Sequence, residues 1–265
     1  MQDYLMSVKG YSRASVTKLK RIKGDILLNG EHIRMVDKIH KGDEIKITFH
    51  KEKSFLTKTD VIVPKVYEDQ DIIIYNKPYG MPVHPSSGHL SDTLANAYAN
   101  EYGDAFRPIN RLDRDTTGLC VVAKNSHTAF KLAKSIKKEY TAVCCGKVTP
   151  LCGSINAPIV RPSMDNIIRA VRYDGQESIT EYKVVAQNEK YSKVLINLLT
   201  GRTHQIRVHF SYLGFPLAGD SLYGGDLTDI KRQALCCTRV MFAHPSTDKQ
   251  MDISIDIQED MKLLI

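Results

Sequence analysis

Residues 109–125, INRLDRDTTGLCVVAKN, join a highly charged turn to a run of apolar residues. The turn places Asp113 between arginines and ends in the small-residue corner TTG. The apolar run LCVVA predicts a buried strand. An aspartate in a turn that ends in glycine is often a structural residue that only stabilises the turn. The flanking arginines, however, favour an ionised carboxylate, and covalent or general-base catalysis requires a positioned ionised carboxylate.

Two further polar clusters follow this stretch. In KEYTAVCCG, which starts at residue 138, Tyr140 lies where a basic helix gives way to an apolar strand. A tyrosine at such a boundary is also typical of a protein core. In GRTHQIRVHF, which starts at residue 201, two arginines open a predicted helix directly after a strand. A helix N-terminus with two arginines favours anion binding, and a salt-bridged helix start is the alternative.

The pattern of elements from residue 67 onward predicts an α+β fold with a mixed, mainly antiparallel sheet, because strands dominate and many are consecutive. One helix is expected to begin at Ser91, and another to turn Ala129, Phe130, Ala133 and Ile136 inward. Strands are predicted at 71–78, 119–125, 140–148, 178–187, 191–200, 238–246 and 251–257, and helices at 91–103, 126–140 and 202–214.

The first 50 residues predict a small separate unit of helix, helix, hairpin and strand. A helix is expected from the N-cap Ser12 to Gly24, and Asn29-Gly30 predicts the hairpin turn. Residues 51–66 are interpreted as a linker with a short strand, and residues 67–265 as one domain. The helix indicates either RNA phosphate binding or a solvated face; its basic residues are Arg13, Lys18, Lys20, Arg21 and Lys23.

Composition narrows the class of protein. The 265 residues are 42% hydrophobic and 25% charged, with a net charge of +7, which favours a polyanionic partner. The six cysteines lack zinc-site spacing and are expected mostly as buried thiols. The chain shows no apolar run of membrane-spanning length and no signal-peptide pattern, so a cytoplasmic location is expected. Nucleotide-binding and metalloprotease motifs are absent, so neither a cofactor nor a metal is predicted.

In order, these motifs resemble those of the RluA-type pseudouridine synthases. The matching stretches are NRLDRDTTGLCVVAK at 110, KEYTAVCCG at 138, GRTHQIRVHF at 201 and GDSLYGG at 219, with IIYNKPYGMPVHPSSG at 73 resembling the first family motif. Residues 1–50 resemble an S4 RNA-binding domain through SRASVTKLKRIKGDILLNGEHI and IHKGDEIKI. The sequence departs from the family pattern at Asn110, where histidine is common, and at Thr117, where serine is usual.

The resemblance implies a role for each cluster. Asp113 matches the catalytic aspartate, Arg207 the arginine that pairs with it, and Tyr140 the tyrosine that packs on the target base. Base stacking of this kind contributes about 1–3 kcal/mol. Contacts with RNA are expected from the remaining polar residues of these motifs, namely Arg111, Arg114, Arg202, His204 and Gln205.

The expected reaction converts uridine to pseudouridine in structured RNA, with large-subunit ribosomal RNA favoured as the substrate. Three alternatives remain open from the sequence: the same activity on transfer RNA, a non-catalytic RNA-binding protein with this fold, and an RNA glycosylase that releases free uracil. The resemblance also implies a monomer that uses no cofactor.

Overall fold

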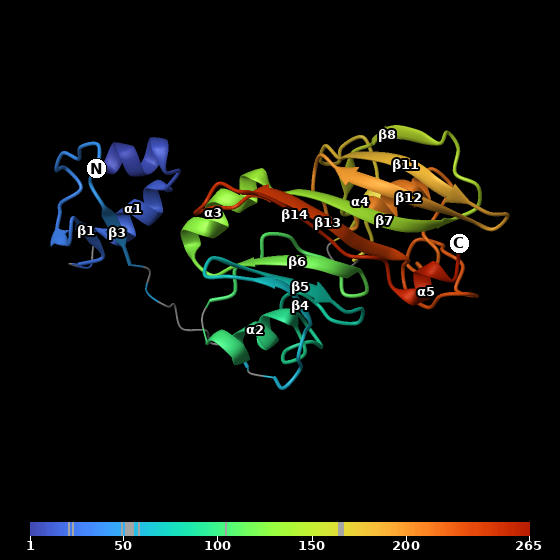
Figure 1. Ribbon diagram of the computed structural model, residues 1–265. Coiled ribbons are helices and arrows are strands. Elements are labelled where there is room, and N and C mark those ends of the chain that lie inside the picture. The colour runs from blue at the N-terminus through green and yellow to red at the C-terminus, as the bar shows by residue number, and fades with distance from the viewer. Residues whose placement is uncertain are drawn as a thin grey trace.

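The computed structural model describes residues 1–20, 22, 24–48, 50, 56–57, 59–103, 105–163 and 167–265, apart from the side chains of Ala14 and Lys18. The chain forms a small N-terminal part and a larger elongated part (Figure 1). No helix in these described ranges is both long enough and apolar enough to cross a membrane.

The N-terminal part has the predicted order of elements. It contains the helices η1 (Tyr4–Val8) and α1 (Arg13–Leu19) and the strands β1 (Ile26–Leu28), β2 (Glu31–His32) and β3 (Ile45–Ile47), which pair in the order β2-β1-β3. Ser12 caps α1, because its hydroxyl accepts the Ser15 N–H at 3.0 Å. Asn29 and Gly30 form the β1–β2 turn as predicted, with positive φ angles of 50° and 87°. The helix ends at Leu19 and not at the predicted Gly24.

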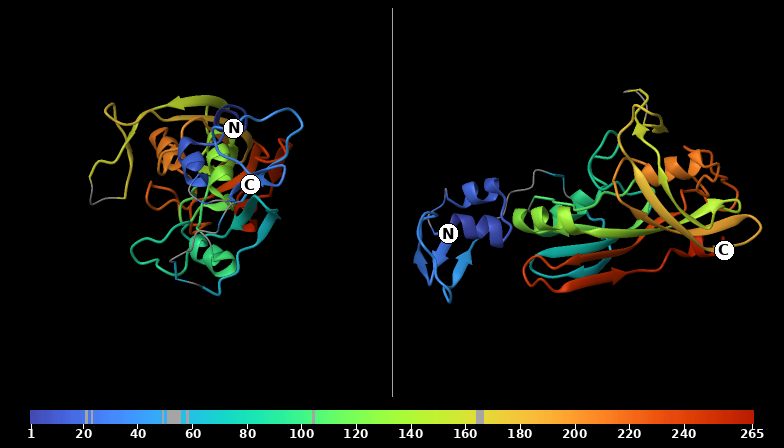
Figure 2. Two further views of the ribbon diagram at one scale, coloured as in Figure 1. Left: turned by 90° about the vertical axis from the view of Figure 1, so that its left-hand side faces the viewer. Right: turned by 90° about the horizontal axis from the view of Figure 1, so that it is seen from above.

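This part has its own small core and rests against the larger part. Leu5, Val16 and Ile26 are buried together between the helices and the sheet. The ring of Tyr11 stacks on His127 of α3 (Ser126–Ser135) with a centroid distance of 3.6 Å. The views in Figures 1 and 2 both place the N-terminal part beside the start of α3.

The larger part is built on one mixed, mainly antiparallel sheet, which confirms the predicted fold class. The only parallel pair among the strands of the described residues joins β6 to β13. The strand order is β4-β5-β6-β13-β7-β12-β11-β8, with β14 beside β13. The strands are β4 (Lys65–Glu68), β5 (Ile72–Lys77), β6 (Thr117–Ala123), β7 (Lys137–Cys145), β8 (Cys152–Asn156), β11 (Ile179–Gln187), β12 (Tyr191–Leu198), β13 (Leu235–Ala243) and β14 (Gln250–Ser254).

Burial explains why these segments form the centre of the sheet. All seven residues of β6 are buried, as the apolar run in the sequence predicts.

The short pair β9 (Ile159–Val160) and β10 (Ala170–Val171) forms a separate two-stranded sheet. The further helices are α2 (Leu94–Tyr102), α4 (Gln205–Tyr212) and α5 (Glu259–Lys262).

Several predicted boundaries are wrong for identifiable reasons. Thr93, rather than Ser91, caps α2, because its hydroxyl accepts the backbone N–H of Asn96. α3 stops at Ser135, because the chain from Lys137 onward pairs with β12 and β13. Ala133, expected to face inward, is exposed. β8, β9, β10 and α5 were not predicted, because these segments are short and only partly apolar.

Candidate active site

The loop that carries Asp113 is attached to β6 by Asn110. The side-chain amide of Asn110 donates to Leu119 O at 2.9 Å, and its oxygen accepts the Val121 N–H at 2.9 Å. Asn110 is 5% exposed, so these bonds form out of water. The residue that departs from the family pattern therefore anchors the loop through two hydrogen bonds.

The small-residue corner after Asp113 lets two strands approach closely. The Thr116 N–H closes the turn by donating to Asp113 O at 3.1 Å. Gly118 has φ +106°, and a Cβ there would lie 2.3 Å from Cys237 O. Only glycine fits this position. The corner thus fixes where the loop enters β6 and how close β6 lies to β13.

Lys77 supports the same loop from the other side. This lysine ends β5, is fully buried, and donates from Nζ to Pro78 O at 2.8 Å, Met81 O at 2.7 Å and Arg114 O at 2.9 Å. Burial lowers the pKa of Lys77 to about 8. The sequence analysis missed this residue, although a lysine at the end of the apolar run IIIYNK was a usable signal.

We expect Lys77→Met to unfold more easily and to lose activity. Three carbonyl groups lose their donor, and each one left unpaired costs about 1–3 kcal/mol, so a loss of at least about 3 kcal/mol in the free energy of unfolding is expected. Urea titration measures it, with Lys147→Met as the control, because Lys147 forms an exposed ion pair with Glu189. Equal stability of both variants would contradict the anchoring role.

Arg207 of α4 joins two aspartates. Its Nη1 donates to Asp113 Oδ2 at 3.1 Å, while Nε and Nη2 donate to Asp220 Oδ2 and Oδ1 at 2.7 and 2.8 Å. The Asp220 side chain is 1% exposed and that of Arg207 8%. Burial disfavours the charged guanidinium, but the two carboxylates outweigh this effect and raise the pKa of Arg207. Asp220, which the sequence analysis did not select, fixes Arg207 against Asp113.

His204 and Tyr223 lie next to this ion pair. His204 Nε2 is 3.9 Å from Asp113 Oδ2, and His204 Nδ1 is 2.8 Å from the hydroxyl of Tyr223. The Tyr223 ring lies under the guanidinium of Arg207, 5.0 Å from it. His204 faces the aspartate, and its expected contact with RNA stays a prediction. Tyr223 was not selected from the sequence.

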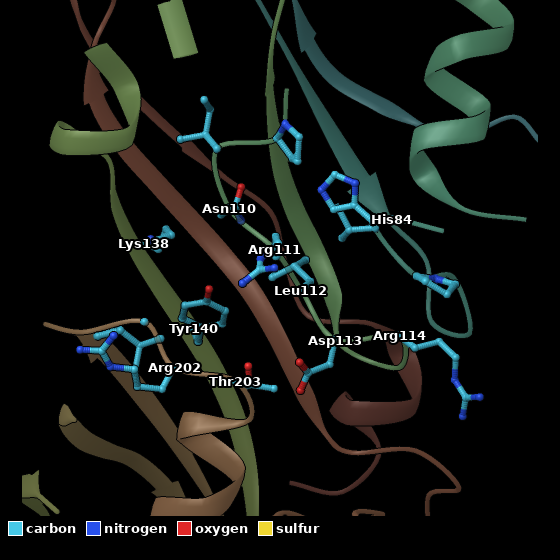
Figure 3. A pocket seen from close by; sticks show the side chains of 16 residues that line it. His84, Asn110, Arg111, Leu112, Asp113, Arg114, Lys138, Tyr140, Arg202 and Thr203 are labelled. Carbon is cyan, nitrogen blue, oxygen red and sulfur yellow. The ribbon is translucent and has the colours of Figure 1, made fainter. Parts of the chain in front are cut away.

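Tyr140 lies in the middle of the sheet, on β7 between β12 and β13. It is 6% exposed, and burial raises the pKa of its phenol well above the ordinary value. The hydroxyl therefore keeps its proton at neutral pH. Asp113 and Tyr140 line the same cleft of about 570 Å³. Figure 3 shows this cleft with Arg111 and Arg202 around Tyr140.

The three arginines near the cleft that were predicted to bind RNA do not all point into it. Arg111 and Arg202 line it. Arg114 also belongs to its rim, but its side chain points away in Figure 3 and pairs with Asp115 at 2.8 Å. Arg111 and Arg202 are therefore better placed than Arg114 to contact a nucleotide next to Asp113.

Gln205 is 2% exposed and holds the start of α4. Its amide nitrogen donates to Ile179 O and Thr180 Oγ1, both at 3.0 Å. Its oxygen accepts bonds from the Arg202 N–H and the Thr200 hydroxyl. Both donors and both acceptor positions of the amide are thus used within the protein. This arrangement gives Gln205 a structural role at the start of α4, and its contact with RNA stays a prediction.

A second hollow of about 580 Å³ continues from the cleft. It shares Arg111 and Arg202 with the cleft and adds Arg161 and Arg169 from the β9–β10 region. Four arginines along a continuous surface favour a polyanion.

Two of the five basic residues predicted in the N-terminal part, Arg13 and Lys20, are exposed on or just after α1. The Lys20 ammonium group donates to Gln2 Oε1 at 2.6 Å. Arg21, Lys23 and the side chain of Lys18 lie outside the described residues. Within the part of the chain that the structure describes, no cluster of His, Cys, Asp or Glu has the makeup of a metal site.

Asp113, paired with Arg207, lines a cleft that also contains arginines and the buried Tyr140. Such a carboxylate can act as a nucleophile or base on a polyanionic substrate. The chain belongs to the RNA pseudouridylate synthase family, whose model matches residues 71–212. The resemblance to RluA-type synthases is confirmed for this domain. The protein is therefore an isomerase that acts on RNA, as predicted.

Relatives and a solved structure agree with this assignment. The chain is 37% identical to an uncharacterized RNA pseudouridine synthase of Bacillus subtilis, over 97% of this chain and 95% of the relative. It is 35% identical to the ribosomal large subunit pseudouridine synthase D of Vibrio parahaemolyticus, over 91% of this chain and 82% of the relative. The structure of human RNA pseudouridylate synthase domain containing 1 is 25% identical and covers 74% of this chain and 83% of its own, with a TM-score of 0.61.

Proposed function

We propose that this enzyme converts uridines of large-subunit ribosomal RNA to pseudouridine, with Asp113, Tyr140 and Arg207 as its catalytic residues. The observation that carries the proposal is the Asp113 carboxylate, held by Arg207 at 3.1 Å in a cleft that Tyr140 also lines. The choice of RNA is supported by relatives named for the large ribosomal subunit.

In this reaction the bond between uracil N1 and the ribose C1′ breaks, the base rotates, and C5 bonds to C1′ while its proton is lost and N1 gains one. Asp113 serves either by attacking the sugar or by removing a proton from it, and both roles need the ionised form. Arg207 supplies the opposing charge that keeps it ionised.

The target base must leave its stack to reach Asp113, which costs a few kcal/mol. Tyr140 offers a ring on which the extruded uracil packs, and stacking returns about 1–3 kcal/mol. Arg111 lines both the cleft and the second hollow, so it is placed to contact the opened RNA. Arg202 and the arginines of the second hollow bind the neighbouring phosphates.

The N-terminal part acts as an S4-like RNA-binding domain and contributes affinity rather than chemistry. Its exposed basic residues Arg13 and Lys20 lie on the part that rests against α3. The enzyme works as a monomer. It works in the cytoplasm, the compartment in which bacterial relatives meet ribosomal RNA.

Replacing both Arg13 and Lys20 with Ala in the full chain is expected to weaken RNA binding and flatten its salt dependence. Each lost phosphate contact lowers the slope of log K against log salt by about 0.7–0.9, so a decrease of roughly 1.5 is expected. Filter binding at several salt concentrations measures the slope, with Lys147→Ala as the control. An unchanged slope would show that Arg13 and Lys20 make no contact with RNA phosphates.

The substrate is tested by mapping pseudouridine with carbodiimide-based sequencing in ribosomal and transfer RNA from cells with and without this gene. Loss of signal at large-subunit uridines supports the proposal, whereas loss only in transfer RNA replaces the substrate. Purified enzyme with ribosomal RNA is assayed for free uracil, which a glycosylase releases and an isomerase does not. An unchanged map, together with no product in vitro, would contradict the activity.

A further inference from the structure

His204 has an unusual backbone for a side chain of its size. Its φ of 57° and ψ of 17° place it in the left-handed region, and its side chain makes no cap bond to α4. Strained backbone of this kind persists where the surroundings over-determine it, and it gathers at functional sites. Here the conformation places the imidazole between the Tyr223 hydroxyl and the Asp113 carboxylate.

The hydrogen bonds around Tyr223 select one form of this imidazole. The backbone N–H of Arg169 donates to the Tyr223 hydroxyl oxygen at 2.9 Å. The hydroxyl has one proton to donate, and His204 Nδ1 lies 2.8 Å from it; with the proton directed there, Nδ1 is the acceptor. In the neutral ring the proton lies on Nε2, the nitrogen that faces Asp113.

The imidazole is neutral at neutral pH, because burial lowers the pKa of His204 below its ordinary value. The charges facing it act in both directions. Asp113 and Asp220 favour the protonated ring, whereas Arg207 and Arg169 oppose it. A neutral N–H can therefore orient the Asp113 carboxylate without changing the net charge of the cluster.

Both neighbours approach the same oxygen of the aspartate. Arg207 Nη1 lies 3.1 Å and His204 Nε2 3.9 Å from Asp113 Oδ2. The 3.9 Å distance is longer than a hydrogen bond, but catalytic hydrogen bonds often tighten only when the substrate is bound. Both groups lie on the Oδ2 side of the carboxylate, so Oδ1 is the oxygen left for the ribose.

We propose that Tyr223 holds His204 in the tautomer protonated at Nε2, and that His204 and Arg207 together bind Asp113 Oδ2 so that Oδ1 reacts. His204 and Tyr223 are thus positioning residues. This inference rests on the proposed catalytic role of Asp113.

The tautomer is tested directly by NMR of the full chain labelled with ¹⁵N histidine. At neutral pH the His204 ring is expected to show a protonated Nε2 and an unprotonated Nδ1, with the signals assigned by their loss in His204→Asn. In Tyr223→Phe this pattern is expected to change to a mixture of tautomers. A ring protonated at Nδ1, or at both nitrogens, in the wild type overturns the inference.

The effect on catalysis is tested with Tyr223→Phe, which keeps the ring under Arg207 and removes only the hydroxyl. Loss of a positioning contact is expected to lower kcat about 10–100-fold with little change in KM. Tyr212→Phe, at an exposed tyrosine that ends α4, is the control. An unchanged kcat for Tyr223→Phe overturns the inference.

Two variants of His204 separate positioning from a merely structural role. Asparagine tolerates the left-handed backbone but has no donor at the position of Nε2, whereas glutamine reaches that position and is strained. Positioning predicts a higher kcat for His204→Gln than for His204→Asn, although His204→Asn is the more stable protein. The opposite order in kcat overturns the inference. If the wild type makes no pseudouridine, the proposed function fails, and the NMR result still decides the tautomer.

Discussion

Asp113→Asn is expected to fold, to bind RNA with wild-type affinity and to make no measurable pseudouridine. An amide neither attacks a sugar carbon nor removes a proton from it, so a decrease in kcat of at least about 10⁴-fold is expected from the loss of a catalytic carboxylate. Arg207 retains its two bonds to Asp220, so the fold should survive the change. Single-turnover assays on a ribosomal RNA fragment measure the rate, and filter binding measures the affinity.

Asp115→Asn is the matched control, because Asp115 lies in the same turn and pairs with Arg114 on the surface. Its activity is expected to stay within about threefold of wild type, as is usual for an exposed ion pair. Turnover by Asp113→Asn at a rate near that of the control would exclude the assigned role of Asp113.

Arg207→Ala has the second large effect, and it acts on stability as well as on activity. The change leaves the Asp220 carboxylate buried without its partner, and breaking a buried pair in this way costs about 3–5 kcal/mol. It also removes the charge next to Asp113. We expect a strongly lowered free energy of unfolding in urea titration and no detectable activity.

A double variant separates the two consequences. Arg207→Met with Asp220→Leu replaces the ion pair by apolar side chains and is expected to recover most of the lost stability, while activity stays absent. Arg239→Ala, which breaks only the exposed pair with Asp252, should cost about 0–1 kcal/mol. Activity in the double variant would show that Arg207 serves the fold and not the reaction.

Local sequence patterns predicted the central strands and the Asp113 turn well. The apolar runs that became β5 and β6 are long enough to be read without tertiary information. The family motifs identified the Asp113–Arg207 pair, although the two residues lie 94 positions apart. The resemblance to the family motifs thus predicted a long-range contact that the periodicity of the sequence does not indicate.

Contacts between motifs were not predictable in the same way. Asp220 lies 13 residues after Arg207, and neither helix nor strand periodicity indicates that the two side chains meet. The bond from Lys77 to Arg114 O spans 37 residues and depends on a fully buried lysine, which composition rules disfavour. Gln205 was selected for its polarity in a functional motif, yet the strand β11 captures its amide.

The only parallel strand pair within the described ranges joins two segments that are far apart in the chain, and this separation affects the order of folding. β6 meets β13 near Thr117, whose hydroxyl also bonds to Gln258, 141 residues further along the chain. Contacts between such distant segments form late, because a long loop must close first. During synthesis, the turn that carries Asp113 is made long before β13, the strand that pairs with β6. A nascent chain that ends before residue 258 therefore contains the Asp113 turn but lacks its contact with Gln258.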